Sequence, residues 1–158
     1  MVVSNTSPLN YLILIEAIDV LPQLYERVII PLSVYQELRA PETPEMVRSW
    51  IERHPAWLEI SSETGSVDSE LASLHAGERE AISLALHLQA DALVIDERQG
   101  RHEAEKRGLK VIGTIGVLVS AHERGFLDIH DSISRLRQTS FHVSPKLLAS
   151  VLQRWKPS

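Results

Sequence analysis

Residues 90–118 have the sequence ADALVIDERQGRHEAEKRGLKVIGTIGVL, in which two short apolar runs enclose a charged segment. The runs, residues 92–95 and 111–113, are long enough for strands and too short for helices. Between them, residues 97–107 favour a charged helix, and Gly108 supplies a natural left-handed cap for its end. A strand, a helix and a second strand in this order predict two parallel strands of one sheet.

Further apolar runs extend this sheet. Val2-Val3-Ser4 is one, Val28-Ile29-Ile30, closed by Pro31, is another, and Leu58-Glu59-Ile60 alternates as an edge strand does. Continuous apolar strands separated by helical segments are typical of a sheet covered on both faces. The fold class is therefore predicted to be α/β, with a central, mainly parallel sheet.

Helices are expected in most of the remaining chain. Capping residues, Pro-initiated turns and helical spacing of apolar residues place them. The expected ranges are 7–19, 33–38, 44–51, 67–74, 78–88, 97–107, 114–124, 129–137 and 144–155. With 158 residues and 44% hydrophobic content, we expect one domain over residues 1–158.

Composition excludes several classes of protein. The chain has no cysteine, which removes disulfides, thiolate zinc sites and cysteine nucleophiles. No apolar run approaches the roughly 20 residues of a membrane helix, and no signal peptide opens the chain, so we expect a cytoplasmic protein without membrane contact. The formal net charge of −5 argues against a broad basic surface, although a local basic patch beside acidic residues is compatible with it.

Polar residues that follow the strands are the first candidates for a site, because ligands of open parallel sheets bind at the carboxyl ends of the strands. Asn5 follows the first strand, and Asp96 follows the strand that ends at Ile95. Both residues also suit a purely structural cap at the start of the next helix. Four oxygen-bearing side chains brought together here would suit Mg²⁺ or Mn²⁺.

Three glutamates are further candidates. Glu37 shares a helix face with Val34, so it is either carried inward or paired with a neighbouring arginine. Glu78 and Glu80 lie in the first turn after Gly77, where the helix dipole alone favours acids. Their positions on the helix do not decide which of the two faces a site.

The order of these residues along the chain resembles a known family. The segments VVSNTSPLNYL (residues 2–12), VIIPLSVYQEL (28–38), LHAGEREAISLAL (74–86) and the opening 90–118 stretch together resemble a PIN domain, of the VapC-like toxin or uncharacterised PIN-like subfamily. The resemblance covers residues 1–125, with the C-terminal helices at 129–155 beyond it. It implies a Rossmann-like three-layer sandwich and hydrolysis of RNA phosphodiesters with Mg²⁺ or Mn²⁺.

The resemblance also implies roles for individual residues. The catalytic and metal-binding positions fall on Asn5, Glu37, Glu80 and Asp96. The accessory positions are Thr6 and Ser7 as hydroxyls near the metal or phosphate, Glu78 in reserve for Glu80, and Glu97. Arg98 and Arg101 supply positive charge for RNA, whereas Lys106 and Lys110 fit a solvated charged surface equally well.

Asn5 departs from the family pattern, which usually has Asp at this position. An amide oxygen still coordinates a hard cation but brings no charge, so metal affinity is expected to fall. The resemblance implies the toxin of a toxin-antitoxin pair, with an RNA substrate, a small antitoxin and a homodimer as partners. Two alternatives stay open: a catalytically silent PIN-like module that binds RNA or protein, and a receiver-like domain phosphorylated on Asp96.

Overall fold

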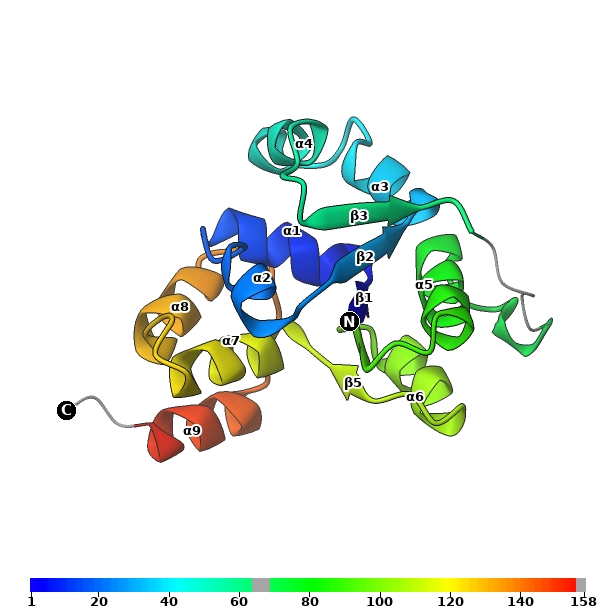
Figure 1. The fold of residues 1–158 in the computed structure, drawn as a ribbon. Coiled ribbons are helices and arrows are strands. Elements are labelled where there is room, and N and C mark those ends of the chain that lie inside the picture. The colour runs from blue at the N-terminus through cyan, green and yellow to red at the C-terminus, as the bar shows by residue number, and fades with distance from the viewer. Residues whose placement is uncertain (64–68, 156–158) are drawn as a thin grey trace.

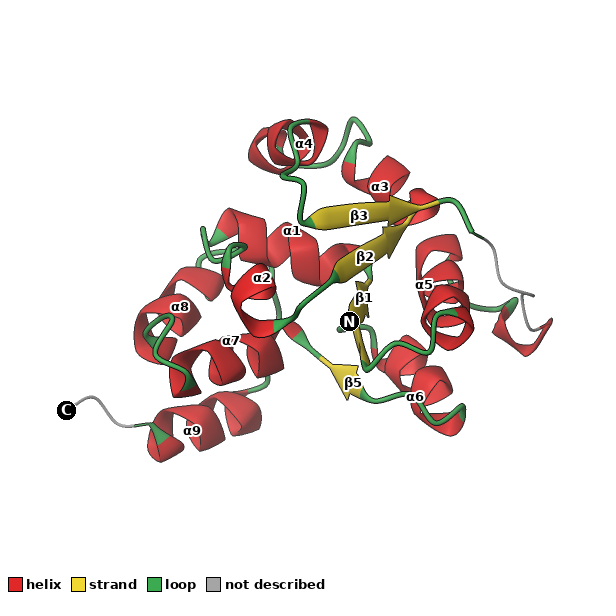
Figure 2. Ribbon diagram, viewed as in Figure 1, coloured by secondary structure: helices red, strands yellow, loops and turns green. Residues whose placement is uncertain are grey.

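The computed structural model describes residues 1–63 and 69–155, and its centre is a five-stranded parallel sheet (Figures 1 and 2). The strands are β1 (Val2–Ser4), β2 (Val28–Pro31), β3 (Leu58–Ser61), β4 (Ala92–Val94) and β5 (Val111–Ile112). Their order is β3-β2-β1-β4-β5, and every neighbouring pair is parallel. The predicted α/β class, and β3 as an edge strand, are confirmed.

Helices connect the strands. They are α1 (Thr6–Leu14), α2 (Val20–Leu24), α3 (Leu32–Leu38), α4 (Glu45–Glu52), the 3₁₀ turn η1 (Ser69–Leu71), α5 (Ala76–His87), α6 (Arg98–Lys106), α7 (Thr114–Glu123), α8 (Ile129–Leu136) and α9 (Pro145–Arg154). The helix expected over residues 67–74 is in part such a 3₁₀ turn, and residues 67 and 68 lie outside the described chain.

The single helix expected over residues 7–19 was wrong. It ends after Leu14, and Glu16 adopts a left-handed φ of 59°. The amide of Ala17 donates to the carbonyl of Leu12 and that of Glu16 to Ile13, which is a Schellman ending. Apolar spacing continues beyond this point because α2 is also amphipathic, so periodicity alone does not reveal the turn.

Alternation along the strands produces the two covered faces. Val2, Val28 and Ala92, which are register partners, point into one core, whereas the next residue of each strand points into the other. Helices α5 and α6 cover this second face, and α1 to α4 with α7 to α9 cover the first. Figure 1 shows α5 and α6 on the opposite side of the strands from α7 and α8. The result is the predicted three-layer sandwich.

The C-terminal helix α9 packs on this same chain. Val151 is buried in the first core, and Leu148 and Trp155 pack against it, whereas Leu147 is 45% exposed. Two contacts tie its end to the preceding helices: the Trp155 ring meets His122 of α7 edge-on, and the Trp155 carbonyl contacts the His130 ring of α8. Within the described chain, no helix combines the length and apolarity that a bilayer crossing requires.

Two leucines on α5 test the assignment of the second core. Leu84 is 1% exposed and Leu86 is 38% exposed. We expect Leu84→Ala to lower the free energy of unfolding by about 2–5 kcal/mol, because it leaves a cavity, and Leu86→Ala to lower it by less than about 1 kcal/mol. Urea denaturation followed by circular dichroism measures both, and equal losses would contradict the packing described.

Candidate metal and nucleic-acid site

A groove of about 1580 Å³ opens at the carboxyl ends of the strands. Its walls come from the start of α1, from α3, α5, α6 and α7, and from the C-terminal helix α9. A site was expected at this end of the sheet, and nine of the ten candidate site residues line the groove, whereas Glu80 does not. Four of the nine carry the acid or amide oxygens of the expected site: Asn5, Glu37, Glu78 and Asp96.

Asp96 is held by three hydrogen bonds. Its Oδ1 accepts from the backbone amide of Thr114 at 2.7 Å, and its Oδ2 accepts from the Thr114 hydroxyl at 2.6 Å and the Ser7 hydroxyl at 3.1 Å. The carboxylate therefore caps the first turn of α7 and not α6, the helix that follows it in sequence, which has no side-chain cap. The simple reading of Asp96 as the cap of its own helix was wrong.

Asn5 occupies the cap position of α1 without acting as a side-chain cap. The side chain makes no capping hydrogen bond, and Oδ1 is buried with no hydrogen-bond partner. The backbone amide of Asn5 donates to the Val94 carbonyl at 2.9 Å, which fixes the residue beside the end of β4. A buried oxygen without a partner is costly, so this atom is available for a ligand or an ordered water.

The side chain of Glu37, on α3, lies close to that of Asn5. The Thr6 hydroxyl donates to its Oε2 at 2.6 Å, and the His75 ring lies 3.6 Å from its Oε1. A methyl group added at Gly77 would lie 2.7 Å from Glu37 Oε2, and 3.6 Å from both Asn5 Oδ1 and Thr6 Oγ1. These three oxygens therefore surround one small space, which is open because residue 77 has no side chain.

Glu78, not Glu80, lines the groove among the described residues of α5. Glu78 Oε2 is buried without a hydrogen-bond partner. Burial raises the pKa of this carboxyl above its usual range, and the negative charge of Glu97 adds to the rise, whereas His75 opposes it. The reserve residue, Glu78, thus lines the groove, whereas the preferred residue, Glu80, does not.

The predicted basic residues divide into two groups. Arg98, Arg101 and Lys110 line the groove, and Arg101 donates from Nη1 to the Ile95 carbonyl at 3.1 Å. Lys106 and Arg107 instead pair with Glu103.

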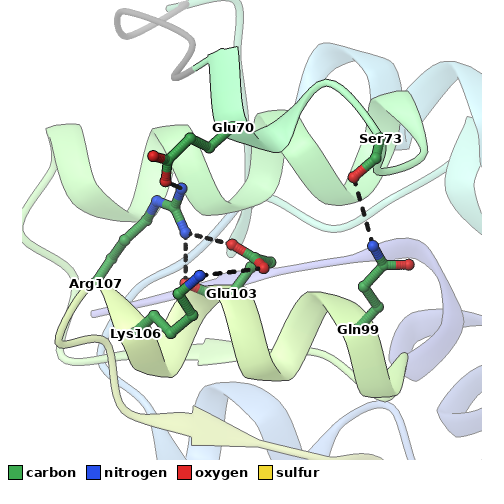
Figure 3. A network of polar contacts seen from close by, with 6 residues as sticks. All are labelled: Glu70, Ser73, Gln99, Glu103, Lys106 and Arg107. Carbon is green, nitrogen blue, oxygen red and sulfur yellow. Dashed lines mark hydrogen bonds and ion pairs between the residues drawn. The ribbon is translucent and has the colours of Figure 1, made fainter.

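Figure 3 shows this second group on α6. Arg107 contacts both Glu103 and Glu70, and Gln99 donates to the Ser73 hydroxyl, so the network ties α6 to η1 and to the loop that leads into α5. These charges stabilise that connection and do not face the groove.

Thr114, the main partner of Asp96, was not predicted from the sequence. Thr114 directly follows the apolar run at residues 111–113, so the search for polar residues after strands could have found it. Nor was the contact of His75 with Glu37 predicted, which α3 and α5 create through packing and which no sequence spacing reveals.

The donor set fits a hard divalent cation. Within residues 1–63 and 69–155, no three His, Asp or Glu side chains are gathered closely enough to hold a metal by themselves. The amide oxygen of Asn5 and the carboxylates of Glu37, Glu78 and Asp96 nevertheless offer only oxygen, and two of these oxygens are buried and unpartnered. This chemistry suits a cation such as Mg²⁺, which retains several waters and needs few protein ligands.

A parallel sheet with oxygen-bearing side chains at its carboxyl end defines the protein as an α/β domain with an acidic groove. The chain matches a family model described as a PIN domain over residues 1–157, and it belongs to this family. PIN domains have a nuclease-type fold. Among the curated proteins and the solved structures that were compared with the chain, none gives a significant match.

The raised pKa of Glu78 predicts a pH-dependent stability. The folded chain holds the Glu78 proton more tightly than the unfolded chain, so its stability falls as the pH rises through this raised pKa. In buffer with EDTA, we expect Glu78→Gln to have a higher melting temperature than the wild type at pH 7. At about pH 4 the two melting temperatures are expected to be nearly equal. Circular dichroism melts test this, with Glu80→Gln as the charge-matched control. No difference at pH 7 between Glu78→Gln and the wild type would contradict it.

The hydroxyl of Thr114 provides a test of how Asp96 is held. Thr114→Val removes a hydrogen bond to a carboxylate at a fully buried position, so we expect a loss of about 1.5–3 kcal/mol in the free energy of unfolding. Thr114→Ser keeps the hydroxyl and is expected to lose less. Urea denaturation compares the two, and a valine variant as stable as the serine variant would show that the hydroxyl does not hold Asp96.

Proposed function

We propose that the protein is a divalent-metal-dependent ribonuclease that hydrolyses RNA phosphodiesters with Mg²⁺ or Mn²⁺. The observation that carries this proposal is the buried, unpartnered Oδ1 of Asn5, which shares one small space with a Glu37 oxygen in a PIN domain. A structural asparagine would use this oxygen in a cap, and Asn5 does not.

Different side chains would bind the metal and position its ligands. Asn5, Glu37, Glu78 and Asp96 are the side chains that would hold the metal. An ion bound there would lower the pKa of a water molecule and would stabilise charge on the attacked phosphate. Thr114 and Ser7 fix both oxygens of Asp96, and Thr6 fixes Glu37, so neither carboxylate has to be ordered when the substrate arrives.

Near this acidic end, Arg101 is placed to meet a phosphate. Its Nη1 lies 2.7 Å from the position that a methyl group on Gly113 would take, and Asp96 Oδ1 lies 3.1 Å from the same position. A cation this close to the carboxylates opposes the repulsion between them and the RNA backbone. Arg98 lines the same part of the groove.

The alternative is a catalytically silent PIN domain that binds RNA or protein. Two observations favour it: residue 5 is an uncharged amide, and within the described residues no three acidic or histidine side chains form a metal cluster. The toxin role, the antitoxin and the homodimer stay predictions from the resemblance.

Cleavage of a labelled structured RNA across a Mn²⁺ titration separates the two candidates. We expect the protein and Asn5→Asp to cut the RNA and Asp96→Asn not to cut it. Because Asn5→Asp adds a negative ligand, it is expected to lower the half-saturating Mn²⁺ concentration by roughly tenfold or more.

Folding of each variant is checked by circular dichroism. Cutting by Asn5→Asp alone would identify a silenced site and overturn the proposal for the natural sequence. Cutting by Asp96→Asn at the rate of the wild type would show that the proposed carboxylate does not act in the reaction, as would cutting without any dependence on metal.

A further inference from the structure

The groove continues well beyond the acidic end, between α1, α7 and α9. We define the C-terminal arm as the part of the groove lined by residues of the 140–155 segment together with Lys110. The acidic side chains that line the groove come from α3 and its following loop, from α5 and from the end of β4, and none comes from the 140–155 segment. One groove thus has an acidic end and an arm without acids.

The sequence of the C-terminal part has an unusual charge balance. After Asp131 the chain contains five lysines and arginines and no Asp or Glu, although the whole protein has a net charge of −5. Of these cations, Arg154 lines the arm and its side chain is 73% exposed. Lys110 makes no ion pair with any residue that the structure describes. The guanidinium of Arg154 lies 4.0 Å from a carboxylate oxygen of Glu123, which does not line the groove, so the positive charge of the arm is only partly offset.

Two aromatic rings line the arm together with these cations. Phe141 and Trp155 are half-buried and line the arm, and the guanidinium of Arg154 lies 4.7 Å from the centre of the Trp155 ring. The Phe141 ring packs edge-on against the Tyr11 ring of α1, with 4.9 Å between the ring centroids, and this contact fixes its orientation. Positive charge interleaved with partly exposed aromatic rings is the composition of grooves that bind single-stranded nucleic acid.

The arm begins close to the carboxylates. Ser7, whose hydroxyl donates to Asp96, and Tyr11, whose hydroxyl bonds to Ser140 at 2.9 Å, are four residues apart on α1. Four residues span about 6 Å along a helix axis, which is one turn. A strand whose phosphate lies at Asp96 therefore needs to extend only a short way to reach Phe141.

We propose that the C-terminal arm binds single-stranded nucleic acid next to the phosphate that occupies the acidic end, with Lys110 and Arg154 on its backbone and Phe141 and Trp155 against its bases. This inference rests on the proposed function for the identity of that phosphate. Apart from Lys110, its residues lie C-terminal to the segments that carry the resemblance to PIN domains. An acidic peptide would satisfy the cations but would leave the two aromatic rings without a role.

Binding of a fluorescent single-stranded oligoribonucleotide of about eight nucleotides, measured by anisotropy in EDTA, tests the arm without hydrolysis. We expect Phe141→Ala to weaken binding by about tenfold, because it removes a stacking ring. Arg154→Ala is expected to weaken binding and to reduce the slope of log affinity against log salt by about 0.7, because one phosphate contact is lost.

Matched controls lie elsewhere on the surface. Phe126→Ala removes an exposed aromatic ring and Arg53→Ala an exposed arginine, and neither residue lines the groove. Both controls are expected to bind like the wild type. If Phe141→Ala loses its fold by circular dichroism, Arg154→Ala carries the test, because its exposed side chain has little part in the core.

Each result has a defined meaning. Arm variants that bind like the controls would overturn the inference, and RNA cleavage by the same preparations would show that the proposed function survives it. Weakened binding by the arm variants, in a protein that never cleaves RNA, would support the arm and overturn the nuclease proposal. Preference for a duplex of the same length, or equal displacement of the oligonucleotide by a glutamate peptide, would overturn the assignment to single strands.

Discussion

The carboxylate of Asp96 joins three elements that are distant in the sequence. It stands at the end of β4, accepts two hydrogen bonds from Thr114 at the start of α7, and accepts a third from Ser7 in the first turn of α1. Hydrogen bonds to a carboxylate are stronger than neutral ones, and both donor residues, Ser7 and Thr114, belong to helix starts that lack a side-chain cap from their own N-cap residue. This one side chain therefore joins the starts of both helices at the acidic end of the groove.

The sheet makes this arrangement possible. Because β1 lies directly between β2 and β4, the residues that follow β1 and β4 emerge side by side, and the amide of Asn5 donates to the carbonyl of Val94. Parallel strands all end at the same edge, so α1, α3 and α7 begin there and bring Thr6, Glu37 and Thr114 to one place. The second face of the sheet supplies Glu78 through α5. A site assembled from both helical layers is stable only while the whole sheet is intact.

Most of this architecture was predictable from residues that are close in the sequence. Short apolar runs gave all five strands to within a residue or two, and Gly108, with its φ of 83°, ended a helix as expected. The site was predictable to the extent that it follows strand ends, which is why Asn5 and Asp96 were found. Glu37 and Glu78 needed either the resemblance or the structure, because a helical position alone does not say which neighbour it meets.

The remaining features depend on contacts between distant segments. The Schellman ending at Glu16 interrupts an unbroken apolar pattern, and Glu78 is favoured over Glu80 by the way α5 packs on the sheet. The C-terminal arm is a stronger example, since Phe141 reaches the groove only because it packs against Tyr11, 130 residues earlier in the chain. The sequence does contain one indication of the arm, the absence of Asp and Glu after Asp131. It could not be interpreted from the sequence, because only the structure shows that α9 lines the groove.

The pairing of β1 with β4 also sets the order in which the protein can be completed during synthesis. Val2 pairs with Ala92 and Ser4 with Val94. About ninety residues of the chain must therefore be synthesised after β1 before β4, its second neighbour, can pair with it. A nascent chain that ends before β4 carries Asn5 and Glu37, but it has neither Asp96 nor the Thr114 that holds it. The acidic end of the groove is therefore complete only after β4 and the start of α7 have been synthesised.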